Sequence, residues 1–223
     1  MLNVILGRNG TNKTEFIYSK IKEDVLNNED VIFIVPEQNS FVSEYKLLEL
    51  LGEENIGKVS CLSFTRLAYE TDRICGNNDL PTLSNGAKAV LMKKAINNCE
   101  DKLTIYKNSV KYLSFINSVI DICDEMTGCE ATPQIVESVA DEIEKKSLKS
   151  KLYDISAIMK EYNSLIENKY FDTVLELSRL YEKLVNLNFF NDKTVYIDGF
   201  FTFGAFEFKI VELIIKQSKN TTV

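Results

Sequence analysis

Near the start of the chain, eight residues have the types and the spacing that bind phosphate. Phosphate-binding loops follow the pattern G-x-x-x-x-G-K-[ST], in which backbone N–H groups surround the phosphates, a lysine reaches their outer oxygens and a hydroxyl holds Mg²⁺. The stretch supplies flexible glycines, a lysine and a threonine, directly after a short apolar run. It therefore predicts a nucleotide-binding loop formed by Gly7, Arg8, Asn9, Gly10, Thr11, Asn12, Lys13 and Thr14.

Asn12 stands where the pattern has its second glycine. Asparagine is among the few residues that tolerate a left-handed backbone, so on steric grounds the change is mild. Crowding by the side chain would weaken the affinity for phosphate. The alternative is an ordinary strand-to-helix turn in which Asn, Gly and Thr serve only to cap the helix.

A candidate metal ligand, Asp198, follows the apolar run VYI much later in the chain. In helicase-type ATPases a strand in this place ends in Asp-Glu, where the aspartate holds the metal and the glutamate activates water. Here the next residue is Gly199, which offers no base, and neither Glu37 nor Glu207 has a reason in the sequence to replace it. The sequence predicts weak or no hydrolysis, no catalytic residue, and Asp198 beside Lys13. The alternative is a plain Asp-Gly turn.

The first 65 residues alternate between strand-like and helix-like stretches. Three short apolar runs are expected to form strands of a parallel sheet, the first two of them buried: residues 2–6, 31–35 and 58–64. A helix follows each run, and the second helix ends at Gly52 with an apolar face at Phe41, Tyr45, Leu48 and Leu51. This order predicts an α/β fold with helices on both faces of a parallel sheet.

Helical periods dominate the middle of the chain, where no strand-like run stands out. Five segments there place apolar residues at three-and-four spacing. Ser84 precedes the first segment as a cap, and Thr132-Pro133 opens the third with a cap and a proline at the first helical position. We therefore expect an all-α insertion domain over residues 76–190.

Strand character returns at residues 193–203, and residues 205–218 are expected to form a final amphipathic helix. The sheet domain is thus expected to consist of residues 1–75 and 191–223, interrupted by the helical insertion. Four strands with a helix running almost to the last residue look unfinished for this fold class. We therefore expect the chain to be a fragment of a longer protein.

Composition narrows the class of protein. The net charge of −7 and the pI near 4.9 give no overall basic field that would attract DNA or anionic lipid. The five cysteines have no paired spacing, and no histidine could complete a mixed zinc site, so reduced thiols are expected. The opening apolar run is too short for a signal peptide, and no run approaches the ~18 residues of a membrane span. We expect a cytoplasmic protein without a membrane segment.

Five stretches, taken in order, resemble one bacterial family: GRNGTNKT, VIFIVPEQNSFVSEYKLLE, VSCLSFTRLAYE, KLYDISAIMKEY and VYIDGFFTFGAFEF. Over essentially its whole length, the chain resembles the N-terminal part of the B subunit of the ATP-dependent helicase/deoxyribonuclease, of the AddB or RexB type. The resemblance implies the superfamily 1 helicase fold, in which a RecA-like P-loop domain carries a helical insertion. Each stretch is short, so the specificity of the match comes from their order and spacing.

The resemblance also implies roles for individual residues. The loop ending in Lys13-Thr14 matches the family's nucleotide loop, and Asp198 matches the Asp-Gly-Phe segment that replaces Asp-Glu, which makes Thr14 and Asp198 the metal ligands. Contacts to DNA are implied for Gln38, Ser63, Phe64 and Arg66. From the residues alone, Phe64 could equally belong to the core, with Arg66 as a solvated residue at the start of a helix.

For the whole protein, the resemblance implies ATP and Mg²⁺ as cofactors and a function in double-strand DNA break repair and recombination. The implied partners are DNA, with its single- and double-stranded ends, and the A subunit of the helicase/nuclease, which supplies the motor. The B subunit is implied to scan for a recombination hotspot sequence. The family's nuclease domain and iron–sulfur cluster belong to a C-terminal part, so we assign none of the cysteines to a cluster and expect no nuclease activity here.

Two other functions stay open on the sequence. One is a free-standing P-loop kinase or NTPase with the helical insertion as a lid. Such a lid needs arginines for phosphate, and Arg179 is the only arginine between residues 76 and 190. The other is a non-catalytic interaction module with a vestigial loop. A test of nucleotide binding would distinguish the interaction module from the helicase-like region. A test of whether turnover depends on DNA would distinguish the kinase or NTPase from it.

Overall fold

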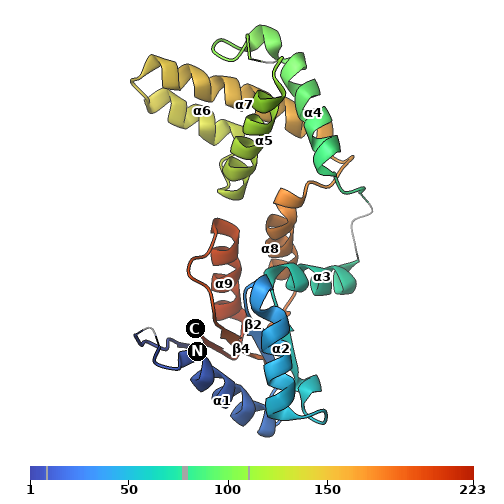
Figure 1. Ribbon diagram of the computed structural model, residues 1–223, viewed down its shortest axis with the longest axis vertical. Coiled ribbons are helices and arrows are strands. Elements are labelled where there is room, and N and C mark those ends of the chain that lie inside the picture. Colours follow the sequence, from blue (N-terminus) through green and yellow to red (C-terminus); the bar gives the residue numbers. More distant parts are fainter. Residues whose placement is uncertain (9, 77–79, 110) are drawn as a thin grey trace. The chain divides into compact units, whose positions relative to one another are not determined.

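The computed structural model describes residues 1–8, 10–76, 80–109 and 111–223. The chain divides into two compact units, of which unit 1 comprises Met1–Asn77 and Glu176–Val223 and unit 2 comprises Asn78–Leu175. Unit 1 contains a parallel sheet with helices, and unit 2 is built from helices (Figure 1). The boundary expected at residue 190 differs from this division, because helix α8 (Glu176–Asn186) packs against the unit 1 helices α3 (Phe64–Cys75) and α9 (Ala205–Gln217).

In the described part of unit 1, five parallel strands form one sheet in the order β1-β5-β4-β2-β3. The strands are β1 (Leu2–Asn3), β2 (Val31–Ile34), β3 (Val59–Leu62), β4 (Thr194–Ile197) and β5 (Asn220–Thr222). The short 3-10 helix η1 (Ile56–Lys58) leads into β3. This sheet confirms the predicted α/β, RecA-like fold class.

Helices cover both faces of the sheet. Along β2, Val31 and Phe33 belong to a core with α1 (Lys13–Leu26) and α2 (Glu37–Leu51). Ile32 and Ile34 belong to a second core, which α3, α8 and α9 complete. Because successive side chains of a strand point to opposite faces, a strand covered on both sides is apolar throughout, as the sequence predicted for this one.

Strand β5 was not predicted, and it changes the position of β1. Hydrogen bonds tie the two strands together, from the N–H of Thr221 to the carbonyl of Met1 at 2.8 Å and from that of Ile5 to the carbonyl of Val223, also at 2.8 Å. The sheet order leaves β1 at an edge, where Leu2 is 45% exposed and Val4 58%. The prediction of a buried strand over residues 2–6 is therefore wrong for this chain, and the expected four strands are five.

Helix α2 ends at Leu51, directly before Gly52, as predicted, but its buried face differs from the predicted one. The residues packed inward are Ser40, Ser43, Leu47 and Leu51. Three of the four apolar residues expected on that face, Phe41, Tyr45 and Leu48, are exposed instead. Small serines permit a close approach between a helix and a sheet, and the sulfur of Cys61 in β3 lies 3.9 Å from the carbonyl oxygen of Ser40.

Unit 2 consists of α4 (Asn85–Asn98), α5 (Leu113–Gly128), α6 (Pro133–Glu142) and α7 (Lys146–Ile166), with short 3-10 helices at Glu100–Lys102 and Thr173–Leu175. The predicted caps are confirmed, since Ser84 accepts a hydrogen bond from the N–H of Ala87 and Thr132 accepts one from the N–H of Ile135. Among the described residues, no helix is long and apolar enough to cross a bilayer.

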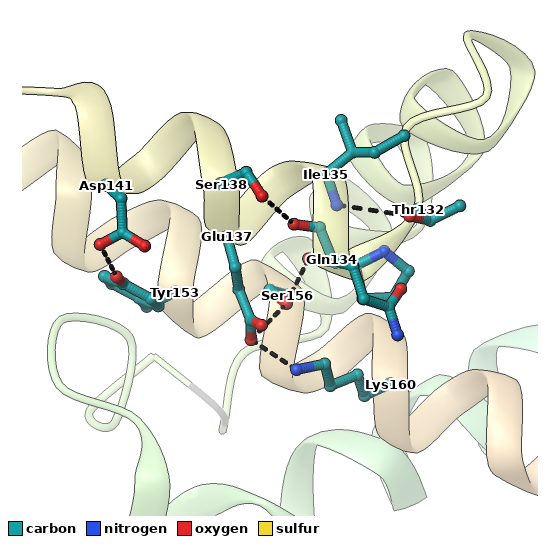
Figure 2. Close-up of polar contacts among 10 residues, drawn as sticks. Thr132, Gln134, Ile135, Glu137, Ser138, Asp141, Tyr153, Ser156 and Lys160 are labelled. Atoms are coloured by element: carbon teal, nitrogen blue, oxygen red, sulfur yellow. Dashed lines mark hydrogen bonds and ion pairs between the residues drawn. The ribbon is translucent and has the colours of Figure 1, made fainter.

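Polar contacts join α6 to α7 (Figure 2). Glu137 accepts hydrogen bonds from the Ser156 hydroxyl at 3.0 Å and from the Lys160 ammonium at 2.6 Å. One turn further along, Asp141 accepts a bond from the Tyr153 hydroxyl. These contacts fix the register of the two helices.

A buried carboxylate also organises the loop after α4. Asp154 of α7, only 2% exposed, accepts bonds from the N–H groups of Thr104, Ile105 and Tyr106 at 2.8–2.9 Å, and from the Thr104 hydroxyl at 3.1 Å. A carboxylate with several N–H donors is a strong, charge-assisted arrangement, so Asp154 anchors this loop.

Candidate nucleotide-binding site

The predicted phosphate loop connects β1 to α1, and all of it except Asn9 lies within the described residues. Thr11 closes a turn on Arg8, donating from its N–H at 3.3 Å and from its hydroxyl at 2.8 Å to the Arg8 carbonyl. A Cβ atom added to Gly7 would lie 2.5 Å from the Thr11 hydroxyl oxygen. A side chain at position 7 would therefore have to displace the Thr11 hydroxyl from its bond to Arg8.

Asn12 adopts the left-handed conformation that an asparagine was expected to tolerate, with φ 54° and ψ 35°. Gly10 also has a positive φ, of 81°. Asn12 stands at the cap position of α1, yet its side chain makes no capping hydrogen bond. No hydrogen bond therefore supports the alternative in which Asn12 serves only to cap the helix. The feature that Asn12 contributes is its left-handed backbone conformation.

Lys13 and Thr14 begin α1. The Lys13 ammonium is folded back on the loop, where it donates to the carbonyls of Gly7 at 2.9 Å and Arg8 at 3.2 Å. Its side chain also lines a pocket of about 150 Å³. Thr14 is exposed at the second position of the helix. The cation and the hydroxyl therefore occupy the start of a helix, where the backbone dipole favours anions.

Asp198 lies at the end of β4 and lines the same pocket as Lys13. Its N–H donates to the Ile34 carbonyl at 3.1 Å, which continues the sheet by one residue. Only β5 lies between β4 and β1 in the described sheet. Because the strands are parallel, the carboxyl ends of β4 and β1 lie at the same end of the sheet. Lys13 and Asp198 thus line one pocket, and the role of Asp198 as a metal ligand stays a prediction.

Gly199 has a φ of 85°, so the Asp-Gly pair does form a turn. A Cβ atom at this position would lie 3.1 Å from the side-chain nitrogen of Asn39 and 3.2 Å from a ring carbon of Pro36. A glutamate in this place would combine a left-handed backbone with these contacts. The surroundings thus select glycine where helicase-type ATPases have their catalytic glutamate.

The two other candidate bases are already engaged. The Ser63 hydroxyl donates to Glu37, and the N–H of Gly204 donates to Glu207 at 2.7 Å, which caps α9. Both carboxylates line a second pocket, not the one that Lys13 and Asp198 share. Neither carboxylate therefore lines the pocket in which a water molecule would lie beside Lys13.

The second pocket, of about 350 Å³, lies where β2, β3 and β4 end. It adjoins the first, because Gly199 and Phe200 line both. Three of the four residues expected to contact DNA line it: Gln38, Ser63 and Phe64. The fourth, Arg66, is not among its lining residues and forms an ion pair with Glu44.

Phe64 is only 5% exposed and packs against Phe200, with ring centroids 5.5 Å apart. The core alternative is therefore the correct one for Phe64, and its ring is not available for stacking. Phe201, which sequence reasoning missed, is fully exposed at the same pocket. A signal was present, since three phenylalanines fall within four residues of a loop after a strand, more than one small core can enclose.

All five cysteines are free. Burial raises the pKa of the Cys61 and Cys123 thiols to about 12 and that of Cys99 to about 11. In the described residues no group of three or more His, Cys, Asp and Glu side chains could hold a metal ion. A metal at the loop would therefore need ligands beyond these side chains, such as a hydroxyl and phosphate oxygens.

Comparison with known proteins extends over the whole chain. Residues 4–223 match the family described as "ADDB, N-terminal". Relatives named as the B subunit of an ATP-dependent helicase/deoxyribonuclease cover the full chain, with 34% identity in Clostridium kluyveri, 30% in Clostridium acetobutylicum and 31% in Clostridium tetani. The chain spans about a fifth of their length, 19–20%. The chain thus belongs to the AddB N-terminal family.

Proposed function

We propose that this chain is the N-terminal, helicase-like region of the B subunit of a bacterial ATP-dependent helicase/deoxyribonuclease, which repairs double-strand DNA breaks together with the A subunit, a helicase/nuclease. In this role it binds ATP with Mg²⁺, contributes to DNA contact and has weak or no hydrolysis of its own. The proposal depends on one observation above the others. Lys13 and Asp198, from opposite ends of the chain, line one pocket at one edge of the sheet.

The residues present suit a nucleotide with its metal. Lys13 would pair with phosphate oxygens, exchanging its present bonds to loop carbonyls for charged ones. Thr14 and Asp198 supply the hydroxyl and the carboxylate that hold Mg²⁺ in P-loop proteins. The left-handed residues Gly10 and Asn12 give the loop backbone the kind of conformation with which N–H groups would surround an anion. ATP and Mg²⁺ would supply the charge that these groups bind.

We expect weak hydrolysis because a catalytic base is missing, and not because nucleotide binding is weak. Gly199 has no side chain, and Glu37 and Glu207 line the neighbouring pocket and not the one that Lys13 and Asp198 share. Positioning and activation of water account for much of the rate in this chemistry, so losing the activating carboxylate removes turnover while leaving affinity.

Calorimetric titration with ATP and Mg²⁺ tests the binding step. We expect saturable heat from the wild type and none from Lys13→Ala. Lys22→Ala is the matched control, because Lys22 is an exposed lysine on the same helix and should leave binding unchanged. Circular dichroism confirms that each variant is folded. No heat from folded wild type at millimolar ATP would favour the vestigial interaction module and overturn the proposal.

Turnover is measured separately, with and without single-stranded DNA. We expect less than about 1 s⁻¹ in both conditions, the low end of ordinary enzyme rates. Turnover at helicase rates would show that the argument about the missing base is wrong. Fast turnover that ignores DNA would favour the kinase or NTPase alternative.

The second pocket supports the DNA part of the proposal. Its carboxylates, Glu37 and Glu207, would repel a phosphate, so a base is the part of DNA that this pocket suits. Phe201 offers a free ring for stacking, and Gln38 offers an amide for a base edge.

Fluorescence anisotropy with a labelled oligothymidine tests this contact. Stacking contributes about 1–3 kcal/mol per base, so Phe201→Ser should weaken binding by about fivefold or more. Phe208→Ser is the control, because Phe208 is an exposed phenylalanine of α9 outside the pocket lining. Equal affinities for wild type and Phe201→Ser would remove the DNA contact from this pocket but leave nucleotide binding untouched.

A further inference from the structure

The outward side of α2 is unusually apolar for a surface. Phe41 is 74% exposed, Val42 64%, Tyr45 57% and Leu48 42%. Single exposed apolar residues are ordinary, whereas four within two turns of one helix form a continuous patch. The inward side of α2 is already packed by its serines and leucines, so this patch is not needed for the core of unit 1.

A groove lies along this patch, with a volume of about 370 Å³. Phe41, Tyr45 and Leu48 form one wall, and Ile56, Val59 and Cys61 form the other, so the groove runs between α2 and β3. Its size is that of a site that accepts several side chains, at the lower end of the range for ligand pockets. Both walls belong to unit 1.

The wall formed by β3 is also a free strand edge. In the described sheet β3 pairs with β2 alone. The Leu62 carbonyl accepts a bond from the N–H of Val35 at 3.0 Å, so the backbone groups of Leu62 face β2. Backbone direction alternates along a strand, which turns the Cys61 N–H and carbonyl away from the sheet. An apolar surface beside an unpaired strand edge is suited to accepting another strand.

An extended occupant fits these groups better than a helix does. A docked helix would cover the edge of β3 without offering partners to its backbone groups, and burying such groups without partners is unfavourable. A strand would pair with them and direct alternate side chains into the groove. The geometry therefore favours strand addition.

Charge defines the occupant further. Glu44 lines the groove and already pairs with Arg66, while Glu49 accepts a hydrogen bond from the hydroxyl of Tyr45, a lining residue. Glu53 and Glu54 are exposed in the turn that precedes Ile56. Lys46 pairs with Glu15, which leaves Lys58 against Glu49, Glu53 and Glu54, so this segment has an excess of carboxylates. A matching segment carries lysine or arginine beside its apolar residues.

We propose that this groove binds an extended segment of another polypeptide, with alternating apolar side chains and flanking basic residues, as an added strand on β3. A second copy of this chain is disfavoured as the occupant, because its net charge of −7 opposes the approach of two copies. The site is separate from the loop and pocket that carry the proposed function.

Two synthetic peptides test the proposal on the ¹⁵N-labelled chain by NMR. Both alternate valine with threonine over five residues; one has two lysines at each end and the other has two glutamates. We expect the basic peptide to shift the Cys61 amide resonance, to slow its hydrogen exchange and to bind about tenfold more tightly than the acidic one, a preference that declines with salt. Tyr45→Ser should weaken binding, whereas Val90→Ser, on an exposed face of α4, should not.

Each contrary result is decisive. Equal affinity for the two peptides would refute the role of charge. Shifts in α2 without any effect on the Cys61 amide would refute strand addition, and the absence of shifts at millimolar peptide would refute the site. Since Phe41, Tyr45 and Leu48 are exposed, their substitution leaves the core intact, and the variants remain informative.

Discussion

Replacing Gly199 by alanine should destabilise unit 1, and the size of the effect can be worked out from its surroundings. At φ 85°, a residue with a Cβ atom enters the left-handed region, at a cost of about 1–2 kcal/mol. The added carbon would lie 3.1 Å from Asn39 and 3.2 Å from Pro36, and the rigid proline ring cannot yield as a flexible side chain would. Such overpacking costs about 1–3 kcal/mol.

An opposing effect comes from the unfolded chain. Alanine restricts the unfolded backbone more than glycine does, which stabilises the folded state by about 0.4–1 kcal/mol. The sum leaves Gly199→Ala about 1–5 kcal/mol less stable than the wild type, with a midpoint of about 3 kcal/mol. Gly86→Ala is the matched control, because Gly86 lies in the first turn of α4 with open space around the position of a Cβ atom. It should be neutral or slightly stabilising.

Pulsed thiol labelling in urea, resolved by mass spectrometry, measures this change. Cys61 is buried in unit 1 and Cys123 in unit 2, so each reports the opening of its own unit. Gly199→Ala should lower the urea midpoint at which Cys61 becomes reactive, and Gly86→Ala should not. An unchanged Cys61 midpoint, within about 0.5 kcal/mol, would refute the argument that Pro36 and the turn select glycine at position 199.

Three further outcomes follow from the described contacts. Asp154→Asn should lower the free energy of unfolding of unit 2 by about 2–4 kcal/mol, since an amide cannot accept from three N–H groups. The control Asp101→Asn, at an exposed position, should change it by less than about 0.5 kcal/mol in the same urea titration. Thr132→Ala removes the cap of α6 and should cost about 1 kcal/mol, measured by circular dichroism in urea. At pH 8, well below their raised pKa values, the buried thiols stay protonated, so iodoacetamide should modify native protein at only two sites, Cys75 and Cys129.

The features that sequence predicted well are those set by neighbours in the chain. The left-handed backbone at Asn12, the caps Ser84 and Thr132 and the helix end before Gly52 each depend on a few consecutive residues. The continuous apolar run of β2 likewise predicts burial on both faces. Local chemistry alone was enough for these features.

The features that sequence missed depend on distant partners. β5 has the polar sequence Asn-Thr-Thr and forms a strand because β1 and β4 lie on either side of it. The spacing of Phe41, Tyr45 and Leu48 correctly marks one face of a helix, yet periodicity cannot tell which face meets the sheet. The close approach allowed by Ser40 and Ser43 decided that.

The departures at Asn12 and Gly199 have different consequences for a nucleotide site. At position 12 the motif requires a backbone shape, and asparagine adopts that shape with φ 54°, so the loop keeps its form. At position 199 the motif requires a carboxylate, which no backbone can replace, and a Cβ atom there would lie 3.2 Å from a ring carbon of Pro36. The loop tolerates asparagine at position 12, whereas the surroundings of position 199 exclude a glutamate. Together these two departures argue for a site that binds a nucleotide without hydrolysing it. If so, Gly199→Glu alone should not create an ATPase, because the glutamate would reach its position only by displacing the turn that carries Asp198.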